Sequence, residues 1–265
     1  MKFLYKRMYS AVCFIYSKVL TVSEKLFLRR NLKSEFSLEK DGFLKISSKF
    51  KLNISKQKFD FILNDNQTSF YSNKYQKKLI LSQENLYIVI NSIFDRQFCN
   101  FLTSQTGFKY SVDFFCAYQN FFIPKEDKDK PWYANHYHLD KPNSENMLKI
   151  FIPMTKIGMK DGPLELVNIS QTQKYLFNKN NIENVNKIYL VGGLGDIFLC
   201  KLNLCLHKAG IPHEGNTTNL IMLQLNPSRK WYINQKIYQR QYKIEPKFTS
   251  LTNKLVKRKL LKQDL

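Results

Sequence analysis

Three side chains in this sequence are of a type and spacing that can hold a metal ion. His138 and Asp140 are separated by one residue, and His207 follows much later in the chain. Residues i and i+2 of a β-strand project from the same face, so His138 and Asp140 can approach one ion together. We expect His207 to be the third ligand, because it ends an apolar, strand-like run over 197–206. Two imidazoles and one carboxylate on one side of an iron ion leave positions open for a cosubstrate and oxygen.

His136 leaves an alternative ligand set open. In the run 135–140 the strand alternation puts His136 on the same face as His138 and Asp140. It could support a ligand by hydrogen bonding or contact a substrate at the rim. A His-x-His pair also occurs in cupin metal sites, in which His136 would itself be a ligand. We prefer His138 and Asp140, because the downstream pattern aligns with that pair.

The sequence after this motif contains several elements in a recognisable order. They are an apolar strand, a Gly-Pro-Leu turn, a Gly-Asp turn, the distal histidine and a further apolar strand, within 148–154, 160–167, 192–199, 206–212 and 219–228. Over residues 114–228 this order resembles the phytanoyl-CoA dioxygenase-like family of iron(II)/2-oxoglutarate oxygenases. The resemblance implies a mainly β fold with added helices, a double-stranded β-helix (jelly roll) with iron at its mouth.

The same resemblance implies the site and the reaction. His138, Asp140 and His207 would hold Fe(II), 2-oxoglutarate would be the cosubstrate, and Phe151 would form a pocket wall. The alternative for Phe151 is an ordinary core aromatic. Hydroxylation of a small-molecule, acyl or sugar-derived substrate is the default outcome, with the metal supplying the chemistry and the protein the positioning.

One part of the family pattern is missing. The family has an arginine about a dozen residues after the distal histidine, which binds the far carboxylate of 2-oxoglutarate bidentately. Here no Arg or Lys occurs between Ala209 and Pro227. Lys149 is our leading substitute, because it precedes Phe151 by two residues and shares its strand face. The alternative is a solvated strand lysine. Thr218 and Asn219 could add hydrogen bonds to the cosubstrate, but no charge.

We expect four regions along the chain. Residues 1–30 read as a basic amphipathic helix, which could lie on an anionic membrane, act as an organelle-targeting presequence or cover the barrel. Residues 31–112 form a mixed support region, with a strand-like piece at 43–46 and a helical stretch over 79–106 that is interrupted at 94–95. Residues 113–228 form the jelly-roll core, in which 168–186 is a candidate lid. Residues 229–265 form a basic extension with a helix over 251–261.

Charge and cysteine content restrict the partners and the compartment. The net charge of +21 is concentrated at the two ends, with fourteen Lys/Arg against five Asp/Glu over 2–60 and eleven against two from residue 229 onward. Basic ends suggest an anionic surface, although a general bias toward lysine gives the same charge. We favour peripheral membrane contact over nucleic acid. Five cysteines without a C-x-x-C pair indicate buried thiols and a reducing cytoplasm, and no apolar run is long enough for a transmembrane helix.

Two rival hypotheses remain at this stage. The missing arginine suggests a barrel that has lost catalysis or uses a different cosubstrate. The basic ends suggest a surface-binding protein whose barrel is only a scaffold. Turnover of 2-oxoglutarate would separate the first rival from an oxygenase, and lipid or nucleic-acid binding without iron would favour the second.

Overall fold

The structure is a computed structural model that describes residues 2–28, 37–46, 69–80, 83–130, 132–140, 144–178, 185–238 and 258–260. Its helices in this part of the chain are α1 (Lys2–Phe27), α2 (Ser37–Asp41), α4 (Gln83–Ile93), α5 (Arg96–Thr106) and α6 (Ile169–Asn178), with 3-10 turns at Lys125–Asp127 and Met159–Asp161. Its strands are β1 (Phe43–Ile46), β2 (Ser69–Asn73), β3 (Gln76–Ile80), β4 (Lys109–Phe121), β5 (Leu148–Pro153), β6 (Glu165–Leu166), β7 (Ile188–Tyr189), β8 (Ile197–Cys200), β9 (His207–Lys208), β10 (Thr217–Ser228), β11 (Tyr232–Tyr238) and β12 (Arg258–Leu260).

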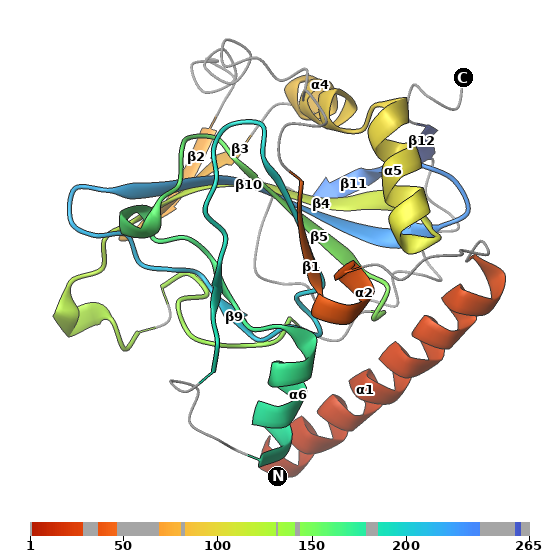
Figure 1. Ribbon diagram of the computed structural model, residues 1–265, viewed down its shortest axis with the longest axis horizontal. Coiled ribbons are helices and arrows are strands. Elements are labelled where there is room, and N and C mark those ends of the chain that lie inside the picture. The colour runs from red at the N-terminus through yellow and green to blue at the C-terminus, as the bar shows by residue number, and fades with distance from the viewer. Residues whose placement is uncertain are drawn as a thin grey trace.

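Two sheets pack into a jelly roll. The larger sheet has the strand order β1-β8-β5-β10-β4-β11-β12, and β3 and β2 extend it from part of β4. The smaller sheet has the order β7-β6-β9. Apart from the parallel pair of β11 with β4, the strand pairs are antiparallel. Long β4 and β10 form the centre of the larger sheet (Figure 1).

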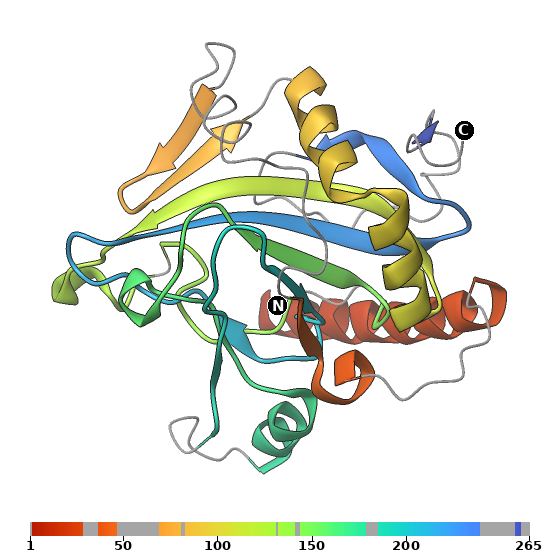
Figure 2. The ribbon, with the colours of Figure 1, turned by 45° about the horizontal axis from the view of Figure 1, so that its top comes forward.

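The two faces of the larger sheet carry different cores. Alternate residues of β10, such as Ile221 and Leu223, pack with the helices α4 and α5 on one face. Leu220 and the partly buried Met222 project from the other face toward the smaller sheet. The layers are visible in Figure 2, in which α4 and α5 lie on one side of the sheet and the smaller sheet and α6 on the other. The period-2 alternation of a strand therefore decides which residues can reach the interior of the jelly roll.

The helical predictions agree with the structure in most places. The stretch over 79–106 forms α4 and α5, and its interruption falls at the expected place because Asp95 accepts a hydrogen bond from the amide of Phe98 at 2.7 Å and caps α5. Residues 79–80 instead belong to β3. The predicted helix over 251–261 is wrong where it can be checked, because Arg258–Leu260 pairs with β11 as β12. The rest of that stretch lies outside the described residues.

The predicted N-terminal helix is present as α1, and the structure places it against the body of the protein (Figure 1). Its polar side contacts the segment 144–146, which leads into β5. None of the helices in the described part of the chain combines the length and apolar character needed to cross a bilayer.

Candidate active site

His138 and His207 are brought together by the backbone. The amide of His138 donates to the carbonyl of His207 at 2.9 Å, and the amide of His207 donates back at 3.0 Å. This single antiparallel bridge holds the two imidazole rings at a centroid distance of 4.3 Å, with their planes tilted by 51°. The expectation of a continuous strand over 136–140 was wrong, since His138 forms only this bridge and Asp140 lies in irregular backbone.

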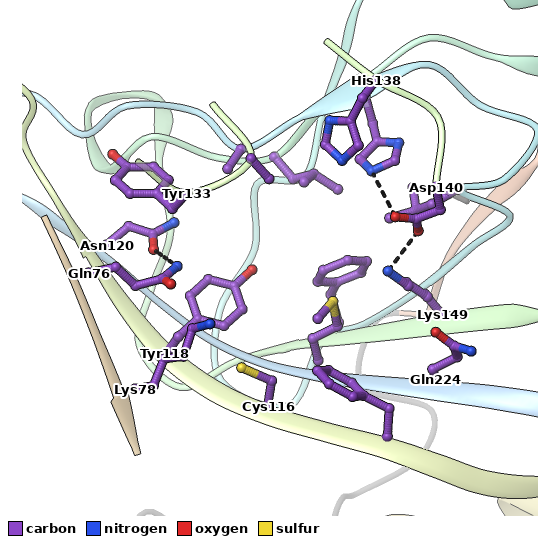
Figure 3. A pocket seen from close by; sticks show the side chains of 18 residues that line it. Gln76, Lys78, Cys116, Tyr118, Asn120, Tyr133, His138, Asp140, Lys149 and Gln224 are labelled. Atoms are coloured by element: carbon purple, nitrogen blue, oxygen red, sulfur yellow. Dashed lines mark hydrogen bonds and ion pairs between the residues drawn. The ribbon is translucent and has the colours of Figure 1, made fainter. Parts of the chain in front are cut away.

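Asp140 completes the cluster from a position two residues after His138, in irregular backbone. Its amide donates to the carbonyl of Leu202 at 3.1 Å, which fixes the backbone beside the bridge. One ligand atom from each of His138, Asp140 and His207 lies within 4.8 Å of the others. Oδ1 of Asp140 is 3.9 Å from Nε2 of His207. The three residues proposed from the sequence as metal ligands are therefore gathered in one place (Figure 3).

The hydrogen bonds of both rings suit metal binding. Nδ1 of His138 lies 2.8 Å from the carbonyl of His136, and Nδ1 of His207 lies 2.9 Å from the carbonyl of Cys205. A carbonyl can only accept, so Nδ1 carries the proton in each ring and the lone pair of Nε2 is left for an ion. Burial lowers the pKa of His207 to about 4, although Asp140 opposes this shift, so the ring is neutral at pH 7.

His136 supports the cluster through its backbone rather than through its side chain. Its side chain is exposed, and it is absent from the group of residues that could hold one ion. Its backbone carbonyl, however, orients the ring of His138. A substitution at this position therefore leaves that orienting hydrogen bond in place.

Lys149 is in contact with the candidate metal ligand Asp140. Its ammonium nitrogen lies 2.6 Å from Oδ2 of Asp140, and both side chains are largely buried. Burial by itself raises the pKa of Asp140, but Lys149 and the two imidazoles outweigh burial and hold this pKa below its ordinary value. The carboxylate is therefore ionised and ready to bind a cation.

A pocket of about 300 Å³ opens beside this cluster, within the size range typical of small-molecule sites. Lys149 and Phe151 both line it, as their shared strand face predicts. Phe151 is 2% exposed and also belongs to the inner core, so it is both a wall and a core aromatic. Met222 and Gln224 of β10 line the pocket beside them.

Thr218 and Asn219 are placed away from the pocket lining. The hydroxyl of Thr218 donates to the carbonyls of Asp161 and Gly162, and the side chain is 1% exposed. Asn219 donates to the hydroxyl of Thr155 at 3.2 Å. Asn219 alternates with Met222 and therefore projects from the opposite face of β10. An arginine introduced at 219 would point away from the candidate metal ligands.

The sequence reasoning missed the far wall of the pocket. Gln76 and Lys78 come from β3, and Cys116, Tyr118 and Asn120 come from β4. Their spacing of two could have identified a shared strand face, but nothing local indicated that the face was internal. The candidate lid behaves differently, since no described residue of 168–178 or 185–186 lines the pocket and α6 instead contacts α2.

The described cysteines are buried free thiols, as expected from the sequence. These are Cys99, Cys116, Cys200 and Cys205. Cys116 lines the pocket, and burial raises its pKa to about 11, although Lys78 and Lys149 oppose the shift. It is therefore a protonated thiol at pH 7 and contributes an apolar wall.

Comparison with known proteins supports the architecture. Neither a family model nor a curated protein sequence matches this chain. Among solved structures, it is similar to the non-heme alpha ketoglutarate dependent epimerase SnoN from nogalamycin biosynthesis, with 9% identity, a TM-score of 0.51, and coverage of 72% of this chain and 79% of the other. It is also similar to the apoform of EctD from S. alaskensis, with 10% identity, a TM-score of 0.51, and coverage of 81% and 86%. These likenesses confirm the jelly-roll fold.

Proposed function

We propose that this protein is an iron(II)- and 2-oxoglutarate-dependent oxygenase that acts on a small molecule. The observation that carries the proposal is the donor set at the pocket. His138, Asp140 and His207 place two imidazole nitrogens and one ionised carboxylate close together beside the pocket. That donor set, with open positions on the other side of the ion, suits non-heme iron and an added cosubstrate.

Two further observations support the type of enzyme. SnoN, which shares the fold, is named as an alpha ketoglutarate dependent enzyme. The order of turns and strands around His138 and His207 favours the phytanoyl-CoA dioxygenase-like branch of such oxygenases. The buried thiols favour a reducing compartment such as the cytoplasm.

The residues of this chain have separable tasks in the reaction. Bound Fe(II) and 2-oxoglutarate would supply the oxidising power for attack on a C–H bond. Lys149 has three N–H donors, so it can stay on Asp140 and also bind the far carboxylate of the cosubstrate. Phe151, Leu164 and Met222 form apolar walls that exclude water from the reacting centre.

Reconstitution tests this proposal. Protein loaded anaerobically with Fe(II) should bind 2-oxoglutarate and, on exposure to oxygen, release carbon dioxide from it, slowly without a substrate and faster with one. The His207→Ala variant is the inactive control, and His136→Ala is the matched histidine control that should remain active. If unmutated protein binds iron but not 2-oxoglutarate, the better interpretation is a jelly-roll protein that is not catalytic or that uses a different cosubstrate.

The orientation of α1 bears on a second function. Three polar residues at spacings of four and three, Ser17, Thr21 and Glu24, are buried against the body. The hydroxyl of Thr21 accepts the amide of Glu145 at 2.9 Å, and the side chain of Asn146 donates to Glu24 at 3.0 Å. The helix therefore docks through its polar face, the reverse of the usual amphipathic arrangement in a soluble protein.

The apolar side of α1 is left exposed. Side chains at spacings of three and four are 56–73% exposed, and they are Val12, Ile15, Val19, Val22 and Leu26. This spacing keeps them on one face of the helix. Phe27, at the end of the helix, is 75% exposed. An exposed apolar stripe of this length on an ordered helix indicates an interaction surface.

We further propose that this stripe lies on an anionic lipid surface, which gives the protein a peripheral membrane contact. Helix α1 contains five Lys/Arg residues and a single acid, Glu24, which is buried against the body. A second copy of the chain would bring like charges together along the stripe, since the helix has no exposed acid to offset them. Anionic headgroups instead attract the lysines while the apolar side chains enter the acyl boundary.

Vesicle flotation distinguishes these occupants. We expect binding to vesicles of phosphatidylcholine with phosphatidylglycerol, weaker binding at high salt, and little binding to phosphatidylcholine alone. The double variant Ile15→Ser/Val19→Ser should bind at least about tenfold more weakly. The matched control, Met159→Ser/Leu176→Ser, removes two exposed apolar side chains outside α1 and should bind normally. A dimer that Ile15→Ser/Val19→Ser disrupts, without lipid binding, would assign the stripe to a second copy.

A further inference from the structure

The pocket has two chemically different ends. At one end lie the candidate metal ligands with Lys149 and Gln224. At the other end lie polar side chains of β3 and β4, and Figure 3 shows them facing the metal ligands across the cavity. These are Gln76, Lys78, Tyr118 and Asn120. Cys116, Phe151 and Met222 line the floor between the two ends.

The strand register sets how far apart the two lysines lie. Lys78 pairs with Tyr118 of β4, Tyr118 pairs with Leu220 of β10, and Lys149 pairs with Gln224 four residues further along β10. Lys78 and Lys149 are therefore separated by three strand spacings and four residues, on the order of 14 Å across the sheet and 13 Å along it. The two lysines are therefore rooted at widely separated positions of the sheet.

The charges of the lining make the far end a place for an anion. Asp140 is the single carboxylate among the described lining residues, and it lies against Lys149. Lys78 brings a second ammonium into the lining at the other end, and its side chain is largely buried, at 7% exposed. An ammonium in a pocket lining can form charge-assisted hydrogen bonds with an anionic group of a ligand, in addition to its contacts within the protein.

We propose that Lys78 binds an anionic group, a carboxylate or a phosphate, on the primary substrate. The inference rests on the proposed oxygenase function, and it adds the class of substrate. Gln76 and Asn120 frame this group as a fixed pair, since the amide of Gln76 donates to the side-chain oxygen of Asn120 at 2.8 Å. The substrate then spans the apolar floor and presents its far end, rather than its charged end, to the metal ligands.

Metal-free protein allows this subsite to be tested apart from the reaction. The metal is first removed from the protein with a chelator. Hexyl phosphate, hexanoate and hexan-1-ol are then each titrated into the metal-free protein, and the heat of binding is measured. The two anions should bind about ten- to a hundredfold more tightly than the alcohol, the usual value of one charge-assisted hydrogen bond. If phosphate is strongly preferred over carboxylate, the substrate is a phosphate ester; the reverse preference indicates a carboxylic acid.

A neighbouring lysine provides the matched control. Lys78→Met should abolish the preference for anions and Lys78→Arg should keep it. Lys77→Met removes the same charge from the opposite face of β3, and it should leave the preference intact. Iron binding by the Lys78→Met variant would verify that this variant is folded. If Lys78→Met does not fold, Lys78→Gln takes its place in the experiment.

The outcomes separate this inference from the oxygenase proposal. An anion preference that survives Lys78→Met and Lys78→Gln, or is lost equally in Lys77→Met, would overturn the subsite. Failure of unmutated protein to bind iron or 2-oxoglutarate would contradict the oxygenase proposal but would leave the anion result in metal-free protein unchanged.

Discussion

His138 and His207 are paired through the backbone, each donating its amide to the carbonyl of the other at 2.9 and 3.0 Å. Two candidate metal ligands from distant parts of the sequence therefore share one backbone bridge. Their ring orientations are fixed independently by the carbonyls of His136 and Cys205. The site is thus organised by backbone before any ion is bound, which reduces the ordering cost of metal binding.

The first prediction concerns this donor set. We expect His138→Ala, Asp140→Ala and His207→Ala each to weaken iron binding by more than about a hundredfold, because loss of a direct ligand should exceed the ten- to hundredfold cost of losing an outer-shell partner. The control His136→Ala should bind iron normally, since the carbonyl that orients His138 is retained. Competition with a chromogenic chelator measures the affinities. Loss of binding in His136→Ala with retention in Asp140→Ala would favour a cupin-like ligand set.

The second prediction concerns the replacement of the missing arginine. Lys149→Ala should raise the apparent dissociation constant of 2-oxoglutarate about ten- to a hundredfold, because one charge-assisted hydrogen bond to the far carboxylate is lost. Lys149→Arg should retain most of the affinity. Binding is measured by anaerobic titration of iron-loaded protein. If the dissociation constant of 2-oxoglutarate is unchanged in Lys149→Ala, Lys149 contacts Asp140 alone, and another residue binds the far carboxylate of the cosubstrate.

The third prediction concerns pH and the docking of α1. Burial raises the pKa of Glu24 from 4.5 to about 7, and hydrogen bonds from Ser144 and Asn146 oppose this shift. The folded protein therefore binds this proton more tightly than the unfolded chain, so the contribution of Glu24 to stability is full below pH 4.5 and is lost as pH rises through 7. The upper bound on this effect is roughly 3 kcal/mol.

Urea unfolding at pH 5 and pH 8 measures the contribution of Glu24 to the free energy of unfolding. Glu24→Gln mimics the protonated acid, so it should change stability little at pH 5 and stabilise the protein by roughly 1–3 kcal/mol at pH 8. Glu145→Gln is the control, because Glu145 forms an ion pair with Lys18 and should give no gain at pH 8. Equal effects of Glu24→Gln at both pH values would show that Glu24 ionises normally in the folded protein.

The fourth prediction concerns the Gly-Pro-Leu turn. Gly162 has a φ of +68°, and a Cβ there would lie 2.4 Å from the backbone nitrogen of Pro212. Gly162→Ala should destabilise the protein by roughly 2–4 kcal/mol through backbone strain and this clash. Gly193→Ala is the matched control, because its Cβ meets nothing within 4 Å. Thermal unfolding compares the two, and equal small effects would contradict the packing described for Gly162.

Part of the site was readable from sequence because it depends on local periodicity and residue chemistry. The residue types of His138, Asp140 and His207 identified the cluster, although the expected strands did not form: Asp140 lies in irregular backbone, and a turn separates the end of β8 from His207. Lys149 and Phe151 line the pocket together, as period-2 alternation requires. The break between α4 and α5 was also readable, since Asp95 is a good N-cap residue.

The remaining features depended on tertiary packing. Only the strand register shows that Lys78 lines the cavity and that Asn219 faces away from it, because a one-residue change in register would exchange the two faces. The contact of Lys149 with Asp140 likewise required β5 to lie beside the metal motif. The amphipathic pattern of α1 predicted the helix but not its orientation. The body offers hydrogen-bonding partners at 144–146, so the polar face docks there and the apolar stripe stays exposed.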